Sequence, residues 1–215
     1  MRNNLIKRII SSIFLIILSF YIIIKGSYLF IFFLIITLAI SLFEWHKMSF
    51  KKYYYLPGLL FLFISFHAAY FIRNDIDEFG LFKFFLILNI CILTDVGGFI
   101  FGKLIKGPKI TKISPNKTYS GSICGLGLAI LGTLIFYNFV GLFGNKLDLT
   151  VAKIIMIVFL ISLTSQLGDI IISFFKRNSK IKDTGKIIPG HGGILDRIDG
   201  MIFVFPICYY SNILQ

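Results

Sequence analysis

Three aspartates in the last third of the chain, Asp169, Asp196 and Asp199, have the chemistry of a divalent-metal site. Carboxylate oxygens are the hard ligands that Mg²⁺ prefers, and it commonly binds one or two of them together with substrate phosphates. Two such ions would clamp the attacking and leaving oxygens of an in-line phosphoryl transfer. Because Asp196 and Asp199 are three residues apart, they share one face if their segment is helical. The alternative is that both only complement the dipole of a helix start.

Asp169 belongs to a polar stripe within an otherwise apolar segment. A carboxylate near the middle of a membrane span costs on the order of 2.5–3.5 kcal/mol, so the stripe is expected to line a bundle interior or a wet cavity. A purely structural pairing of Asp169 with a lysine is the alternative. The stripe residues are related by steps of three or four, which places them on one helical face: Ser162, Ser165, Gln166, Asp169, Ser173 and Lys176.

The loop that follows the stripe contains candidate phosphate-binding groups. Gly192 and Gly193 would let backbone amides approach an anion, and the helix start after them favours negative charge. His191 is a candidate for binding phosphate or donating a proton, with a structural role as the alternative. A basic run either binds phosphate as well or only anchors the chain at the membrane surface: Lys176, Arg177, Lys180 and Lys182.

A second polar island interrupts the apolar sequence at residues 94–98. Asp95 lies there, and a carboxylate within a membrane span is by default a functional candidate. The basic stretch that follows, residues 102–118, is broken by glycine and proline and is expected to lie on the lipid headgroups. Lys117, at its end, is a candidate ligand of a triphosphate or a lipid phosphate.

Long apolar blocks must position these groups. The chain has 215 residues, of which 57% are hydrophobic and 15% charged, and its mean hydropathy is +0.87. A soluble domain of this length cannot bury so much apolar surface. We therefore predict an all-α fold, a polytopic transmembrane helix bundle forming a single integral membrane domain over residues 1–215, with a catalytic region at 95–121 and 162–200. About seven spans are expected: 5–24, 28–43, 54–72, 81–101, 119–143, 151–175 and 198–214.

The first segments admit other interpretations. The first apolar block, with Arg2, Lys7 and Arg8 before it, resembles a signal peptide but lacks a small-residue cleavage site, which favours an uncleaved span. The joint between the first two segments is so short that they are alternatively a re-entrant hairpin. The three cysteines lie in apolar blocks without metal-ligand spacing and are interpreted as small hydrophobic residues.

The distribution of basic residues predicts the orientation. Seventeen of them precede span one or lie in the loops after spans two, four and six, whereas the opposite side has Lys25, Arg73, Lys146 and Lys153. The positive-inside rule places the N-terminus and the seventeen residues in the cytoplasm. Because the basic residues alternate with spans, the net charge of +12 indicates anionic lipid and phosphate as partners, and no nucleic acid.

At these motifs the sequence resembles the phosphatidate cytidylyltransferase (CDP-diacylglycerol synthase) family. The family's signature is Ser-x-x-Lys-Arg, four residues, Lys-Asp, then Pro-x-His-Gly-Gly-x-x-Asp-Arg-x-Asp. The residues that match it with the same spacing are Ser173, Lys176, Arg177, Lys182, Asp183, Pro189, His191, Gly192, Gly193, Asp196, Arg197 and Asp199. The segment 114–121 is similar to a further motif, Ser-Pro-Lys-Lys-Thr-x-Glu-Gly, but lacks one of its basic residues and its acidic residue.

The resemblance implies a reaction and a set of site residues. Phosphatidic acid would attack the α-phosphorus of CTP at the cytoplasmic side of the cell membrane, giving CDP-diacylglycerol and pyrophosphate. Asp169 and Asp196 would be ligands of Mg²⁺, and His191 and Asp199 would also be catalytic. A homodimer is one assembly that the enzyme could form. Substrate binding would involve Asp95, Lys117, Ser173, Lys176, Arg177, Lys182, Asp183, Gly192, Gly193 and Arg197.

Two other classes of protein compete with this interpretation. A CTP-dependent polyprenol or lipid kinase would have a similar membrane core but would transfer the γ-phosphoryl group. A transporter without chemistry would need polar groups that trace a path across the bilayer, together with an inverted repeat, and neither is apparent here.

Overall fold

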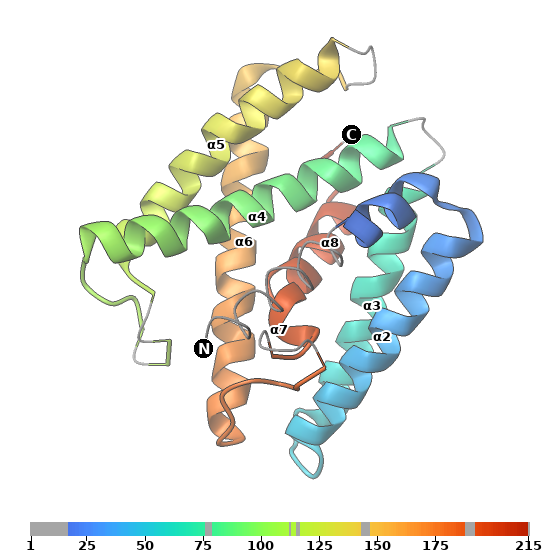
Figure 1. Ribbon diagram of the computed structural model, residues 1–215, viewed down its shortest axis with the longest axis vertical. Helices are drawn as coiled ribbons and strands as arrows, with labels where there is room; N and C mark the ends of the chain where they lie inside the picture. The colour runs from blue at the N-terminus through green and yellow to red at the C-terminus, as the bar shows by residue number, and fades with distance from the viewer. Residues whose placement is uncertain are drawn as a thin grey trace, which may run out of the picture. The chain divides into compact units, whose positions relative to one another are not determined.

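The protein is helical in every long element of the computed structural model, which describes residues 17–75, 79–111, 113–114, 117–142, 147–187 and 192–214. The described residues contain no strand, and an isolated β-bridge pairs Lys109 with Thr118. The predicted all-α fold is therefore confirmed. After a helical segment at 17–25, the helices (Figure 1) are α2 Ser27–Ser49, α3 Tyr55–Arg73, α4 Gly80–Ile105, α5 Tyr119–Gly141, α6 Val151–Asn178, α7 Leu195–Ile198 and α8 Met201–Tyr210.

Five of these helices, α2 to α6, are long and apolar enough to cross a membrane. Each covers one of the predicted spans, and their ends differ from the predicted ends by a few residues, most at the end of α2. The first predicted span lies largely outside the described residues. The last is represented by α8, whose ten residues extend over about 15 Å, half of a bilayer core. The count of seven spans and the side of the N-terminus stay predictions.

The chain divides into two compact units. The first unit consists of the residues up to Phe66 together with Phe175–Ile198, and thus contains α2, most of α3, the last residues of α6, and α7. The second unit consists of His67–Phe174 and the residues from Asp199 onward, and contains α4, α5, most of α6, and α8.

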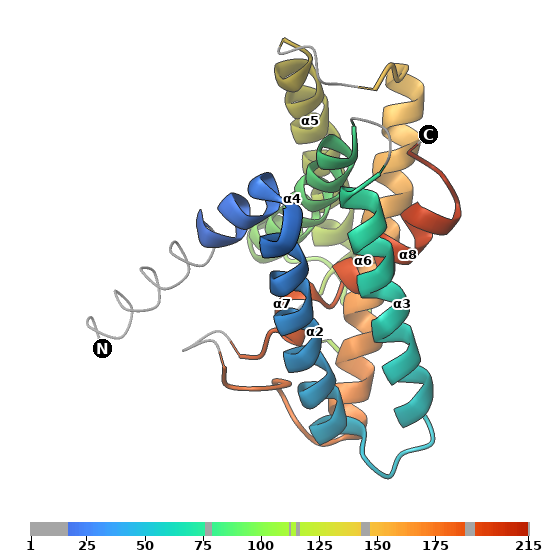
Figure 2. The same cartoon turned by 90° about the vertical axis from the view of Figure 1, so that its right-hand side faces the viewer.

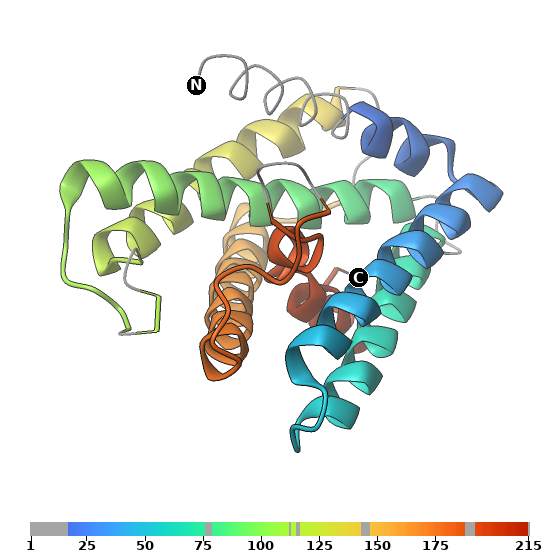
Figure 3. The same ribbon diagram turned by 60° about the horizontal axis from the view of Figure 1, so that its bottom comes forward.

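In the second unit, α4 and α5 pack closely against each other, and Figure 3 shows α5 crossing α4 at an angle. Glycines permit this contact. A Cβ added at Gly125 would lie 2.6 Å from the carbonyl oxygen of Thr94, and one added at Gly121 would lie 2.6 Å from that of Gly98. The start of α5 is fixed by Thr118, whose hydroxyl accepts a hydrogen bond from the backbone N–H of Gly121 at 3.1 Å.

In the first unit, α2 and α3 lie side by side (Figure 2). Trp45 of α2 is buried against Gly58 of α3, where a Cβ would overlap its ring, and its indole N–H donates to the carbonyl oxygen of Tyr55 at 3.0 Å. Trp45 also contacts the ring of Phe175, so that the end of α6 packs on the same helix. The unit thus holds the loop after α6 next to the end of α2.

Candidate active site

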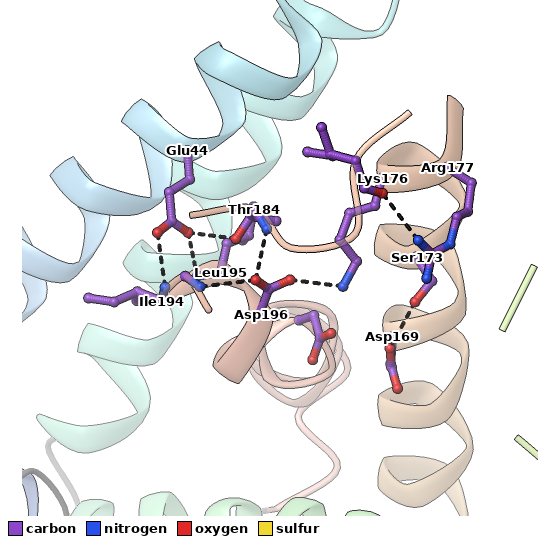
Figure 4. A network of polar contacts seen from close by, with 12 residues as sticks. Glu44, Asp169, Ser173, Lys176, Arg177, Thr184, Ile194, Leu195 and Asp196 are labelled. Atoms are coloured by element: carbon purple, nitrogen blue, oxygen red, sulfur yellow. Dashed lines mark hydrogen bonds and ion pairs between the residues drawn. The ribbon is translucent and has the colours of Figure 1, made fainter. Parts of the chain in front are cut away.

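The Asp196 carboxylate is the centre of a polar network in the first unit, drawn in Figure 4. Its Oδ1 accepts a hydrogen bond from the Lys176 ammonium at 2.8 Å, and the two form an ion pair. Its Oδ2 accepts from the backbone N–H groups of Thr184 at 2.8 Å and Gly193 at 3.0 Å. Only 6% of the Asp196 side chain and 10% of the Lys176 side chain are exposed. This carboxylate is therefore held in one orientation from three directions.

The environment of Asp196 favours its charged form. Burial alone would raise its pKa, but the hydrogen bond and charge of Lys176 and the N–H groups of Gly193 and Thr184 together hold the pKa below its ordinary value. Asp196 is thus an anion at neutral pH, as a ligand of a cation must be.

The Asp169 carboxylate is the centre of a second network, in the second unit. Its Oδ2 lies 2.5 Å from the ammonium of Lys117, in an ion pair that is about three quarters buried. Its Oδ1 accepts from the hydroxyl of Ser173 at 3.2 Å, one turn later on α6 (Figure 4). Lys117 also donates to the carbonyl oxygen of Gln166 at 3.3 Å. The start of α5 and the middle of α6 are joined through this lysine.

The polar stripe on α6 continues from this centre toward the start of the helix. The side-chain amide of Gln166 donates to the Ser162 hydroxyl at 3.2 Å, and its carbonyl oxygen accepts from the Ser122 hydroxyl of α5. Ser162 and Ser165 are both buried. The stripe predicted from the three- and four-residue spacing therefore faces other helices of the unit.

The glycines of the loop face carboxylates of the protein itself. Gly192 has a φ of 87°, a backbone conformation that favours glycine, and a Cβ there would lie 2.8 Å from Asp196 Oδ2. A Cβ at Gly193 would lie 2.4 Å from a carboxylate oxygen of Glu44. The absence of side chains at this pair leaves room for these two carboxylates, and the binding of a substrate anion by the backbone amides stays a prediction.

The remaining predicted site residues are described one by one within their own units. Asp199 follows the end of α7 in a turn, where it accepts from the backbone N–H of Gly200 at 3.0 Å, so the helix that carries Asp196 does not extend to Asp199. Asp95 is exposed on α4. Arg177 donates to the carbonyl oxygen of Ile181 at 3.2 Å. His191 lies outside the described residues. The side chains of the other three are exposed, namely Lys182, Asp183 and Arg197.

Two residues of the network were not predicted from the sequence. Glu44, near the end of α2, is 1% exposed and accepts hydrogen bonds from Thr184 and from the backbone at the start of α7. The signal for Glu44 was present, because an acidic residue in an apolar helix is a functional candidate by default. Thr184 gave no signal, since a threonine in a polar loop is unremarkable without the fold.

The residues fit a divalent cation only if the substrate supplies further ligands. Within the part of the chain that the structure describes, no three His, Cys, Asp or Glu side chains converge on one point. Mg²⁺ is usually held by one or two carboxylates, waters and substrate phosphates, and not by an all-protein cage. Asp169 and Asp196 have the required oxygen donors, each next to a lysine that now balances its charge.

Membrane-length helices and two aspartate–lysine centres define the class, a polytopic membrane protein with charged groups suited to phosphate chemistry. Comparison with known proteins specifies it further. The model of the cytidylyltransferase family matches residues 51–214. The phosphatidate cytidylyltransferase of Rickettsia bellii is 36% identical over 222 aligned positions, covering 98% of this chain and 92% of the relative.

Other relatives have the same name. The phosphatidate cytidylyltransferase of Rickettsia felis is 35% identical and covers 99% of this chain and 94% of the relative. That of Staphylococcus haemolyticus is 37% identical over 153 aligned positions, which are 71% of this chain and 55% of the relative. The chain belongs to the cytidylyltransferase family, and the resemblance found in its motifs is confirmed.

Proposed function

We propose that this chain is a phosphatidate cytidylyltransferase, which converts CTP and phosphatidic acid to CDP-diacylglycerol and pyrophosphate. The observation that carries the proposal is the similarity over 98% of the chain to a relative of that name. In the reaction, a phosphate oxygen of phosphatidic acid forms a bond to the α-phosphorus of CTP. The bond from that phosphorus to the oxygen of the β-phosphate breaks, and pyrophosphate leaves with the electron pair.

The two aspartate–lysine centres have the charges that this reaction requires. Phosphoryl transfer depends mainly on positioning and on balancing negative charge. Lys176 and Lys117 are ammonium groups within networks that fix their positions, and each is proposed to bind a substrate phosphate. Ser173, which donates to Asp169, is proposed to orient that carboxylate.

Asp169 and Asp196 are each proposed to be ligands of Mg²⁺. When bound, the cation would neutralise charge on the phosphates of CTP and on the leaving pyrophosphate. The three donors around Asp196 orient its carboxylate before any substrate binds. Lys176 would then have to share or release Asp196, and the Lys176 ammonium would become available to a substrate phosphate.

The remaining predicted site residues are proposed to bind the substrates at the cytoplasmic surface of the cell membrane. The predicted concentration of basic residues on that side supports this location, because phosphatidic acid and CTP are both anionic. The residues concerned are Asp95, Arg177, Lys182, Asp183, His191, Gly192, Gly193, Arg197 and Asp199.

Pyrophosphate release from the purified protein tests the proposal. We expect release in the presence of both CTP and phosphatidic acid and of a divalent cation, and none when either substrate is omitted. Release from CTP without phosphatidic acid would indicate a hydrolase, and no release with both substrates would contradict the proposed function.

A further inference from the structure

Glu44 is a buried carboxylate that holds the loop that carries Asp196. It lies on α2 with 1% of its surface exposed. Its Oε1 accepts from the backbone N–H of Ile194 at 3.0 Å, and its Oε2 from that of Leu195 at 2.8 Å and from the Thr184 hydroxyl at 2.8 Å. In all three bonds the carboxylate is the acceptor, which is what an ionised carboxylate can do.

The donors come from both arms of the loop. Thr184 follows α6 by six residues, whereas Ile194 and Leu195 lie at the start of α7, directly before Asp196. Thr184 is bonded twice, since its hydroxyl donates to Glu44 and its backbone N–H donates to Asp196 Oδ2 (Figure 4). Glu44 therefore fixes both the residue that precedes Asp196 and one of the three groups that orient its carboxylate.

The loop is shaped to admit this glutamate. A Cβ at Gly185 would lie 2.4 Å from Glu44 Oε1, and one at Gly193 would lie 2.4 Å from Oε2 and 2.3 Å from the Thr184 hydroxyl. Any larger residue at either position would have to displace the carboxylate. Two glycines on opposite arms of the loop thus make room for one side chain from α2. Helix α2 lies before residues 51–214, the segment that the family model matches.

We propose that Glu44 is a positioning residue for the reaction: through Thr184 and the start of α7 it holds Asp196 in the orientation that catalysis needs. This rests on the proposed function. A group that acts through another residue should affect turnover more than the apparent affinity for CTP, because it does not touch the substrate itself.

Replacing the threonine tests the connection without disturbing the glutamate. Thr184→Val keeps the size of the side chain and its backbone N–H bond to Asp196 but removes the hydroxyl that donates to Glu44. Thr184→Ser keeps that hydroxyl. We expect kcat to fall about tenfold in Thr184→Val, with KM for CTP changed less than about threefold, and to stay near the wild-type value in Thr184→Ser.

Glu44→Gln tests the glutamate directly. Its amide NH₂ would face hydrogen-bond donors at one of the two oxygen positions, so we expect kcat to fall at least as far as in Thr184→Val. The double variant Glu44→Gln, Thr184→Val should lose less than the product of the two single losses, because both remove the same hydrogen bond. Asp148 is an exposed carboxylate in the second unit, so Asp148→Asn is the matched control and should behave as wild type.

Limited trypsin digestion provides a measurement that does not need activity. Lys180, Lys182 and Lys186 are exposed in the loop, and cleavage there should be faster in Glu44→Gln and Thr184→Val than in Thr184→Ser or wild type. If wild type were inactive, the proposed function would fail while this comparison still decided whether Glu44 holds the loop. Equal cleavage in all variants, or equal kcat in Thr184→Val and Thr184→Ser, would overturn the proposal. If Glu44→Gln failed to fold, the two Thr184 variants would decide alone.

Discussion

Replacing Asp196 by asparagine should remove both activity and part of the protein's stability. The substitution keeps the size of the side chain but deletes its charge, and its NH₂ group must face either the Lys176 ammonium or the N–H groups of Thr184 and Gly193. Removing one member of a buried ion pair costs about 3–5 kcal/mol, because the other charge is left without compensation. Because 10% of the Lys176 side chain is exposed, we expect the loss in the free energy of unfolding to lie near the lower end of this range.

A second variant separates the two effects. In Asp196→Asn combined with Lys176→Met, no uncompensated charge remains, so the free energy of unfolding should return toward the wild-type value while turnover stays lost. Denaturant or thermal unfolding in detergent measures the free energy of unfolding, and pyrophosphate release measures turnover. Turnover above about a tenth of wild type in Asp196→Asn, a difference of only about 1.4 kcal/mol in barrier, would refute the role of Asp196 as a metal ligand.

The pH dependence of stability checks the same centre. The pKa of Asp196 is lower in the folded protein than in the unfolded chain, so its contribution to stability is present above the unfolded value, about 3.9, and is lost as the pH falls through the folded value. The difference in stability between wild type and Asp196→Asn should therefore shrink as the pH falls below about 4. A difference that stays constant to lower pH would mean that Asp196 is not an ionised partner of Lys176.

Three further predictions concern other parts of the chain. Adding Mg²⁺ should raise the melting temperature of wild type, by mass action on the folded state, and raise it much less in Asp169→Asn; an undiminished rise would exclude Asp169 as a ligand. Gly125→Ala should destabilise the protein by about 1–3 kcal/mol, because its Cβ meets the backbone of α4, whereas Gly127→Ala, with nothing within 4 Å, should cost nothing; equal effects in thermal unfolding would contradict the packing of α4 on α5. Cysteines placed at Lys182 and Asp75 should react with a membrane-impermeant reagent from opposite sides of the membrane, and labelling from the same side would contradict the predicted orientation.

The helices could be predicted because their signal is local. Apolar blocks of sufficient length gave α2 to α6, and the spacing of Ser162, Gln166 and Asp169 gave the polar face of α6. The predicted end of the second span was less accurate. It was placed at residue 43, where the apolar run stops, whereas α2 continues to Ser49, and the residues beyond the run include Glu44.

The partners of the charged groups could not be predicted, because they depend on tertiary structure. The sequence indicates that Asp169 needs a cation but not that Lys117, 52 positions earlier, supplies it. Nor does it show that Glu44 meets Thr184, 140 positions away. The glycine pair at 192 and 193 was predicted to let a substrate anion approach the backbone, and only the fold shows that protein carboxylates lie there.

The most direct test of the proposed reaction is to follow the phosphorus atoms of CTP. Purified protein is incubated with phosphatidic acid, Mg²⁺ and CTP labelled with ³²P at either the α or the γ position, and the lipid is then extracted. A phosphatidate cytidylyltransferase transfers the α label to lipid and releases the γ label as pyrophosphate. Transfer of the γ label to lipid, with the α label left in solution as CDP, would instead identify a lipid kinase and contradict the account.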